Sequence, residues 1–332
     1  MIKTFLATLN PILVLFICIV LGFVLSKTKI LPEFAGSVMA KLEVWVFCPA
    51  LNFYTMAYYC TIEKIGAHAS SVIIASLVLS VMVPLACLLS RFFVRQNVYS
   101  RNVYKYAFTF SNHGYMGDPL VEAVLGGPGL AFHKVYTLPM TVVIYTWGSN
   151  ILIPHDKKQR TNLMLKLINA PMVALILGII AGLTGAGSFL IGTDTPTFFG
   201  STLVALKSCM GPVAMLLVGI TIARYSVKIM LTNVKVYIAT ILRMIVLPAI
   251  TVAFVFVLTL LAKVAFNLYI DNLVLHIAYF TAGCPLGLNT VVFPEAYGGD
   301  SSTGASMAMV SHTACVVVVP LMYALLCVLF PL

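Results

Sequence analysis

The stretch Phe110-Ser-Asn-His-Gly-Tyr-Met-Gly-Asp-Pro119 lies inside a long apolar segment, where an ordinary membrane-spanning helix would be expected. A second stretch, Phe280-Thr-Ala-Gly-Cys-Pro-Leu-Gly-Leu-Asn289, interrupts another apolar segment in the same way. Irregular backbone at membrane depth is tolerated only where it is buried in protein or lines a cavity. Interrupted segments at matching positions of two halves of a chain are a pointer to a transporter's binding site. We therefore expect the two stretches to form the two halves of one site.

The composition is that of a polytopic membrane protein. Hydrophobic residues make up 61% of the 332 residues and charged residues only 9%, which is unlike a soluble domain of this length. The net charge is +10, but the basic residues lie in alternate loops, so no nucleic-acid partner is expected. The cysteines are scattered singly without metal-ligand spacing, so we expect neither a disulfide framework nor a metal site. The expected surroundings are the lipid bilayer.

Ten apolar segments are long enough to span a bilayer, which takes roughly 20 residues. They are residues 9–26, 36–59, 68–93, 103–126, 129–153, 168–187, 198–223, 234–262, 271–297 and 303–330. The loops after spans one, three, five and seven carry most of the loop Lys and Arg residues, so they are expected to face the cytoplasm. This orientation places both termini outside, and the expected location is the plasma membrane.

The two halves of the chain match in register. The matched prolines are Pro11 with Pro171, Pro49 with Pro212, and Pro84 with Pro248, which lie 160, 163 and 164 residues apart. Gly22 and Gly182 also match and are expected to allow close helix packing. Each half has an odd number of spans, so the halves form an inverted repeat. The expected division is residues 1–154, a cytoplasmic linker at 155–167, and residues 168–332.

Residues that can bind a ligand gather at the two interruptions. A broken helix exposes backbone N–H groups that favour an anion, and asparagine adds amide donors and acceptors. The expected substrate-binding residues are Asn52, Asn112, His113, Gly114, Asn289 and Thr290, and the expected helix-breaking residues are Gly117, Pro119, Pro285 and Gly287. Asn112 and Asn289 have an alternative role, which is to cap the freed backbone groups.

Asp118 admits two interpretations. Asp directly before Pro119 fits a helix N-cap followed by proline at the first helical position. A carboxylate inside the membrane also indicates function, because burying its charge is costly; Asp118 would then couple transport to H+ or Na+. An ionised Asp118 would compete with an anionic substrate unless it is protonated or a cation lies beside it. Glu122, four residues later on the same helix face, is a second ion-coupling candidate or a helix-end residue near the headgroups.

Other charged residues lie within the spans. Glu43 in span two and Lys207 in span seven stand at nearly repeat-related positions and could pair with each other, which would neutralise both; a substrate-attracting Lys207 is the alternative. His113 either titrates at the break or is a packed neutral histidine. Weaker candidates are His133, Lys134 and His312.

Four motifs appear in a fixed order along the chain. They are Phe47-Cys-Pro-Ala-Leu51, Asn112-His-Gly-Tyr-Met-Gly-Asp-Pro-Leu120, Pro212 through Gly219-Ile-Thr-Ile-Ala223, and Pro285-Leu-Gly-Leu-Asn289 through Tyr297-Gly298. Together they resemble the auxin efflux carrier family, including its bacterial malate/malonate-permease-like branch and its plant relatives. Asp118 stands at a position that is usually apolar in the plant members, and His113 stands where Thr is common.

The resemblance implies an all-α, bile-acid/sodium-symporter-like fold of ten helices, in which broken helices four and nine cross. Helices one, two, six and seven would form a scaffold, often dimeric, so a homodimer is expected. Helices three to five and eight to ten would move as an elevator-like transport domain.

The expected function is secondary transport of small organic anions such as mono- or dicarboxylates, including auxin-like ones. The sequence has no GxxxxGK[ST] loop for ATP and neither HExxH nor a G-x-S-x-G elbow, so an enzyme is not expected. No cofactor is expected beyond the coupling ion. The alternative is a sensor built on a transporter fold that acts through a partner.

Overall fold

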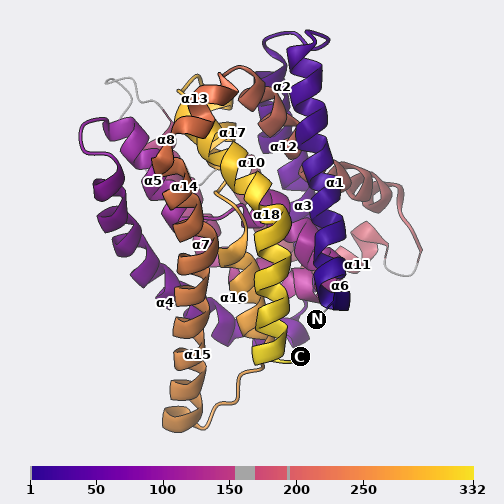
Figure 1. Ribbon diagram of the computed structural model, residues 1–332. Coiled ribbons are helices and arrows are strands. Elements are labelled where there is room, and N and C mark those ends of the chain that lie inside the picture. Colours follow the sequence, from indigo (N-terminus) through magenta and orange to yellow (C-terminus); the bar gives the residue numbers. More distant parts are fainter. Residues whose placement is uncertain (1, 154–168, 193–194) are drawn as a thin grey trace.

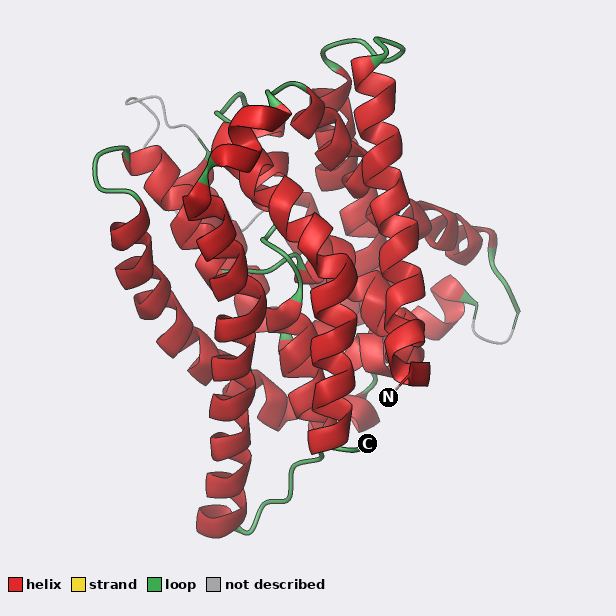
Figure 2. Cartoon of the chain, in the orientation of Figure 1, coloured by secondary structure: helices red, strands yellow, loops and turns green. Residues whose placement is uncertain are grey.

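The computed structural model describes residues 2–153, 169–192 and 195–332, and within these ranges all regular elements are helices (Figures 1 and 2). The α-helices are α1 (Ile2–Lys27), α2 (Ala35–Leu42), α3 (Cys48–Tyr59), α4 (Ile62–Phe93), α5 (Val98–Thr109), α6 (Asp118–Tyr136), α7 (Leu138–Val143), α8 (Ser149–Leu152), α10 (Ala170–Leu183), α11 (Ala186–Ile191), α12 (Phe198–Ala223), α13 (Val227–Thr232), α14 (Val234–Ile241), α15 (Leu247–Phe266), α16 (Leu273–Gly283), α17 (Asn289–Tyr297) and α18 (Ser302–Leu329). Four π-helical turns are η1 (Glu43–Phe47), η2 (His113–Gly117), η3 (Ile144–Gly148) and η4 (Leu242–Val246). The expected linker at 155–167 lies outside the described residues.

Several helices are long and apolar enough to cross a membrane. They are Thr4–Lys27, Ser70–Phe93, Phe198–Ala223, Val234–Phe266 and Ser302–Leu329, with shorter apolar helices at Ala170–Leu183 and Leu273–Gly283. The helices and the composition are those of a polytopic membrane protein. The two ends of the chain lie at the same end of the helix bundle (Figure 1).

Two expected spans continue through a π-helical turn. The turn η1 directly precedes α3, whose second residue is Pro49, and η4 directly precedes α15, whose second residue is Pro248. Proline has no N–H and its ring clashes with the carbonyl one turn earlier, so the helix widens there instead of ending. Each span therefore passes its proline without interruption.

Glycines allow two helix pairs to approach closely. Helix α1 packs mainly on α12, and α10 packs mainly on α3. A Cβ added at Gly22 of α1 would overlap the Leu216 carbonyl of α12, and one added at Gly182 of α10 would meet carbonyls of Met56 and Cys60. The prediction that Gly22 and Gly182 permit close packing is confirmed.

Candidate functional site

The two interrupted stretches lie side by side and pair through their backbones. Asn112 N–H donates to the Pro285 carbonyl (2.9 Å), and Gly287 N–H donates to the Phe110 carbonyl (3.0 Å). Ser111 and Leu286 form an isolated antiparallel bridge. These bonds give hydrogen-bond partners to backbone N–H and C=O groups that lie outside the helices. Buried backbone groups away from water require such partners.

Helix ends converge on this pairing. Helices α5 and α16 end at Thr109 and Gly283, whereas η2 begins at His113 and α17 begins at Asn289. The ends of α5 and α16 present carbonyls and the starts of η2 and α17 present N–H groups, so partial charges of both signs meet at one place. Of the helix-breaking residues, Pro285 and Gly287 lie in the link between α16 and α17, Gly117 ends η2, and Pro119 is the second residue of α6.

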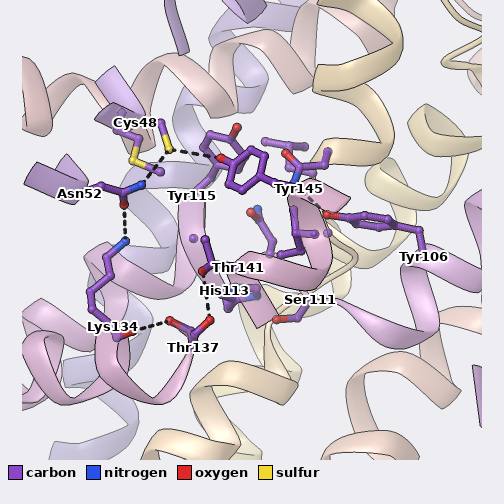
Figure 3. Close-up of a pocket in the computed structure, with 17 residues that line it drawn as sticks. Cys48, Asn52, Tyr106, Ser111, His113, Tyr115, Lys134, Thr137, Thr141 and Tyr145 are labelled. Atoms are coloured by element: carbon purple, nitrogen blue, oxygen red, sulfur yellow. Dashed lines mark hydrogen bonds between the residues drawn. The ribbon is translucent and has the colours of Figure 1, made fainter. Parts of the chain in front are cut away.

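A cavity of about 60 Å³ lies beside the paired stretches and is called the crossing cavity below. It has room for a few water molecules or a small polar ligand. Its lining comprises Cys48, Asn52, Tyr106, Ser111, Asn112, His113, Gly114, Tyr115, Lys134, Thr137, Thr141, Ile144, Tyr145, Met210, Gly287, Leu288 and Asn289. Figure 3 shows these side chains around the hollow, with Lys134 reaching toward Asn52. The sequence-predicted Asn52, Asn112, His113, Gly114 and Asn289 thus share one cavity.

Thr290 is placed differently. Its side chain is fully buried, it is not among the residues lining the crossing cavity, and its hydroxyl donates to the Gly287 carbonyl (2.9 Å). Thr290 therefore fixes the start of α17. Neighbouring Asn289 lines the cavity and donates from Nδ2 to the Tyr106 hydroxyl (2.7 Å).

Asp118 forms a buried charged cluster with two later residues of α6. Its Oδ1 is 3.0 Å from His133 Nδ1, and its Oδ2 is 2.5 Å from Lys134 Nζ. The three meet because α6 turns sharply at Gly126, whose φ of 72° is a conformation that glycine adopts without strain. The N-cap interpretation is wrong: Gly117 precedes α6 and no side chain caps it, while the Asp118 carboxylate is used by His133 and Lys134. The cation that an ionised Asp118 requires is Lys134.

The cluster continues into other helices through Lys134. Lys134 Nζ also donates to Asn52 Oδ1 of α3 (3.3 Å), and Asn52 Nδ2 donates to the Pro171 carbonyl of α10 (3.1 Å). A chain of polar contacts therefore runs from α6 across α3 to α10. These contacts join α6 to α3 and α3 to α10.

Histidines surround the site in distinct roles. His312 Nδ1 donates to the Ala308 carbonyl (2.9 Å), so its Nε2 accepts from Asn112 Nδ2 (3.1 Å) and the ring is neutral. The rings of His113 and His133 are 6.2 Å apart. Within the described ranges, His113 Nδ1 and His133 Nε2 are buried and have no hydrogen-bond partner. His113 is therefore a packed histidine whose Nδ1 is buried without a hydrogen-bond partner in that part of the chain.

A second cavity, of about 450 Å³, lies between α1, α3, α6 and α12 and is called the side cavity. Asp118, Glu122 and Lys207 are in its lining. Lys207 Nζ is 3.2 Å from Glu122 Oε1 and 4.9 Å from the centre of the Tyr54 ring. The prediction that Lys207 pairs with Glu43 is wrong, because the fold brings Glu122 of α6 to Lys207. Asp118 lines the side cavity while its partner Lys134 lines the crossing cavity.

The family model for a membrane transport protein matches residues 7–163 and 159–323, which include both interrupted stretches. The chain belongs to the auxin efflux carrier family. The resemblance drawn from the four motifs is thereby confirmed, and the family indicates membrane transport as the general function. Comparison with curated proteins gives no match.

Sequence reasoning missed one buried cation of this carrier. Arg243, in η4, is 1% exposed, and its Nη2 donates to the Ala282 carbonyl in the last turn of α16 (2.8 Å). Together with Ser111 and Thr281 it lines a cavity of about 20 Å³. No carboxylate in the described part of the chain forms an ion pair with it. The available signal was a lone Arg inside the apolar span 234–262, which by default marks a functional position.

Glu43 is a second ionisable residue that has no ion-pair partner in the described part of the chain. It is fully buried (0% exposed), and neither carboxylate oxygen has a hydrogen-bond partner among the residues that the structure describes. Burying an ionised carboxylate without a partner is costly, whereas a neutral group of the same shape can be accommodated. The side chain therefore contributes shape rather than an ion pair.

Replacing Glu43 by glutamine is expected to change the free energy of unfolding by less than about 1 kcal/mol, because glutamine keeps the shape and carries no charge. Glu43→Lys is the contrasting variant and is expected to prevent folding, since it buries a cation with no counter-ion. Thermal unfolding of the purified variants in detergent checks both outcomes. A loss in Glu43→Gln as large as that in Glu43→Lys would show that the carboxylate has an ionic partner.

Proposed function

We propose that this carrier moves small organic anions, carboxylates among them, across the plasma membrane by secondary transport. The observation that supports it most is the pairing of two interrupted stretches beside a cavity that contains Lys134 and three asparagines. Helix N-termini, amide groups and one ammonium are the donors that a carboxylate needs. Discontinuous helices at a shared site are typical of secondary transporters.

The proposed architecture is a five-plus-five inverted repeat of ten spans, in which broken helices four and nine cross. The hydrogen bond from the Ser111 hydroxyl to the Thr281 carbonyl (2.5 Å) supports it, since these residues are 170 apart and each is the second residue of its interrupted stretch. The scaffold would comprise α1, the α2–η1–α3 span, α10 and α12, which pack on one another. Their exposed apolar side chains, such as Ile17 and Leu177, suit lipid or a second copy in a homodimer. We propose that both termini face outward.

Alternating access is proposed to be elevator-like. Polar contacts join the proposed moving part to the scaffold at separate places. They are Lys134 with Asn52 (3.3 Å), Glu122 with Lys207 (3.2 Å) and Glu295 with Arg224 (2.7 Å). Such contacts can be exchanged when one part slides past the other. Asp118, with Glu122 as a second acid, is the proposed site of coupling to H+ or Na+.

Uptake into proteoliposomes tests the function. Purified carrier in liposomes is expected to take up radiolabelled lactate or malonate saturably, faster than protein-free liposomes do. Uptake should increase when a pH gradient or a sodium gradient is imposed, and the gradient that acts identifies the coupling ion. Uptake of both anions equal to that of protein-free liposomes, under either gradient, would contradict the proposal.

A further inference from the structure

Lys134 is the one ammonium in the described lining of the crossing cavity. An ammonium has three N–H donors. Asp118 Oδ2 accepts one at 2.5 Å and Asn52 Oδ1 accepts another at 3.3 Å. A third donor is left for a ligand in the cavity that Lys134 lines. Asp118 does not line this cavity, so an entering anion meets the ammonium and not its counter-ion.

We propose that Lys134 binds the carboxylate of the transported anion, and that this binding is linked to the uptake of one proton by the Asp118–substrate pair of carboxylates. The inference rests on the proposed function, which it deepens by naming the recognising residue and the coupled ion.

The linkage follows from the charge count at the site. Before binding, the Lys134 ammonium and the Asp118 carboxylate neutralise each other. An incoming carboxylate leaves two negative charges on one ammonium inside the membrane, where an excess charge is costly. Two carboxylates that share a site take up a proton to relieve this repulsion. The loaded site then holds one ammonium, one carboxylate and one carboxylic acid, and is neutral.

The surroundings give the proton a route. Asp118 lines the side cavity, so the proton can arrive on the face away from the substrate. His133 contacts Asp118 directly, at 3.0 Å. The other titratable groups around the pair are Glu122 on the same helix, Lys207 of α12, Cys48 of α3, Tyr106 of α5, His113 and Tyr115 of η2, Tyr145 of η3 and Cys284 after α16. Glu122 and Lys207 neutralise each other, so neither supplies the missing charge.

Calorimetry of benzoate binding tests the inference. It is measured on the full chain in detergent between about pH 5.5 and about pH 8, a range in which benzoate stays ionised. Wild-type affinity is expected to fall as pH rises, by up to about tenfold for each pH unit. Asp118→Asn leaves no carboxylate to take up the proton, and its Lys134 ammonium keeps Asn52 as an acceptor and lines the cavity that the anion enters, so its affinity should be independent of pH. It should also be at least as high as that of the wild type at the lowest pH.

Lys134→Met alone removes the ammonium from the buried Asp118 carboxylate, which then keeps only its contact with His133, and this variant can fail to fold. The double variant Asp118→Asn/Lys134→Met removes both charges, so it is expected to fold and to bind no benzoate at any pH. Lys105→Met is the matched control, because Lys105 also donates to an amide oxygen, that of Asn102 (3.3 Å), and does not line the cavity. Its affinity and pH dependence should equal those of the wild type.

Wild-type affinity that does not change with pH, or that changes only with sodium, would overturn the proton linkage. Benzoate binding by the double variant with wild-type affinity would overturn the role of Lys134. If that variant also keeps the uptake of lactate or malonate, the proposed function stands and only this inference fails. Lack of uptake by the wild type itself would remove the proposed function and the inference with it.

Discussion

Replacing Gly287 by alanine is expected to abolish transport and to lower the free energy of unfolding by about 2 kcal/mol or more. A Cβ at this position would lie 2.8 Å from Cε1 of Tyr106, 2.9 Å from the Phe110 carbonyl oxygen and 3.2 Å from that of Ser111. Two of these atoms belong to the backbone of the other interrupted stretch. The third belongs to a fully buried ring whose hydroxyl is held by Asn289. The stretches must therefore separate, which breaks the bond from Gly287 N–H to Phe110.

Gly117→Ala is the matched control, because Gly117 occupies the repeat-related position in the first stretch. The atom nearest to a Cβ added at Gly117 would be Cys284 Sγ, at 3.4 Å, which is an ordinary van der Waals contact. We expect this variant to keep both stability and transport. Thermal unfolding in detergent and uptake into liposomes compare the two variants. Equal losses of stability and transport in both would contradict the conclusion that only Gly287 lies too close to the other stretch for a Cβ.

Arg243→Ala is expected to destabilise the carrier by about 3 to 5 kcal/mol. The guanidinium side chain is among the largest that are fully buried, so truncation leaves a cavity. It also removes the donor to the Ala282 carbonyl, near the end of α16. Since α16 leads directly into the second interrupted stretch, transport should fall together with stability. The apparent melting temperature in detergent is the measurement.

Arg243→Met separates packing from charge. Methionine fills much of the volume without a charge, and removing a buried, unpaired ion offsets the lost hydrogen bond. We expect most of the stability to return in this variant. If Arg243→Met is as unstable as Arg243→Ala, the guanidinium charge itself holds α16, and packing is not the cause.

Much of the fold could be predicted because its signals are local. The apolar lengths of the spans, the interruptions at residues 110–119 and 280–289, and the packing glycine Gly22 are properties of short stretches of sequence. The repeat register predicted that the two interruptions belong together, and the structure joins them through Asn112 and Gly287. Tyr106 was missed, because nothing along the chain indicates which aromatic residue of α5 faces the other stretch.

The partners of the charged residues were harder to predict. Sequence reasoning paired Lys207 with Glu43 by repeat symmetry, but Glu122 is the residue that reaches Lys207. Asp118 next to Pro119 fits an N-cap, yet its carboxylate is taken by side chains 15 and 16 residues later. Periodicity relates residues three or four apart on a helix. It does not show how a turn such as that at Gly126 brings two segments together.

The sequence by itself determined an all-helical membrane protein of the auxin efflux carrier family with two interrupted segments. It could do so because hydropathy, glycine and proline determine the conformation of residues close to them in the sequence. Only the tertiary structure decided that Lys134 neutralises Asp118 and faces the crossing cavity. It also decided that Glu43 and Arg243 lack ionic partners in the described chain. Ion pairing inside a membrane depends on distances of a few ångströms between helices, and those distances are set by packing of the whole bundle.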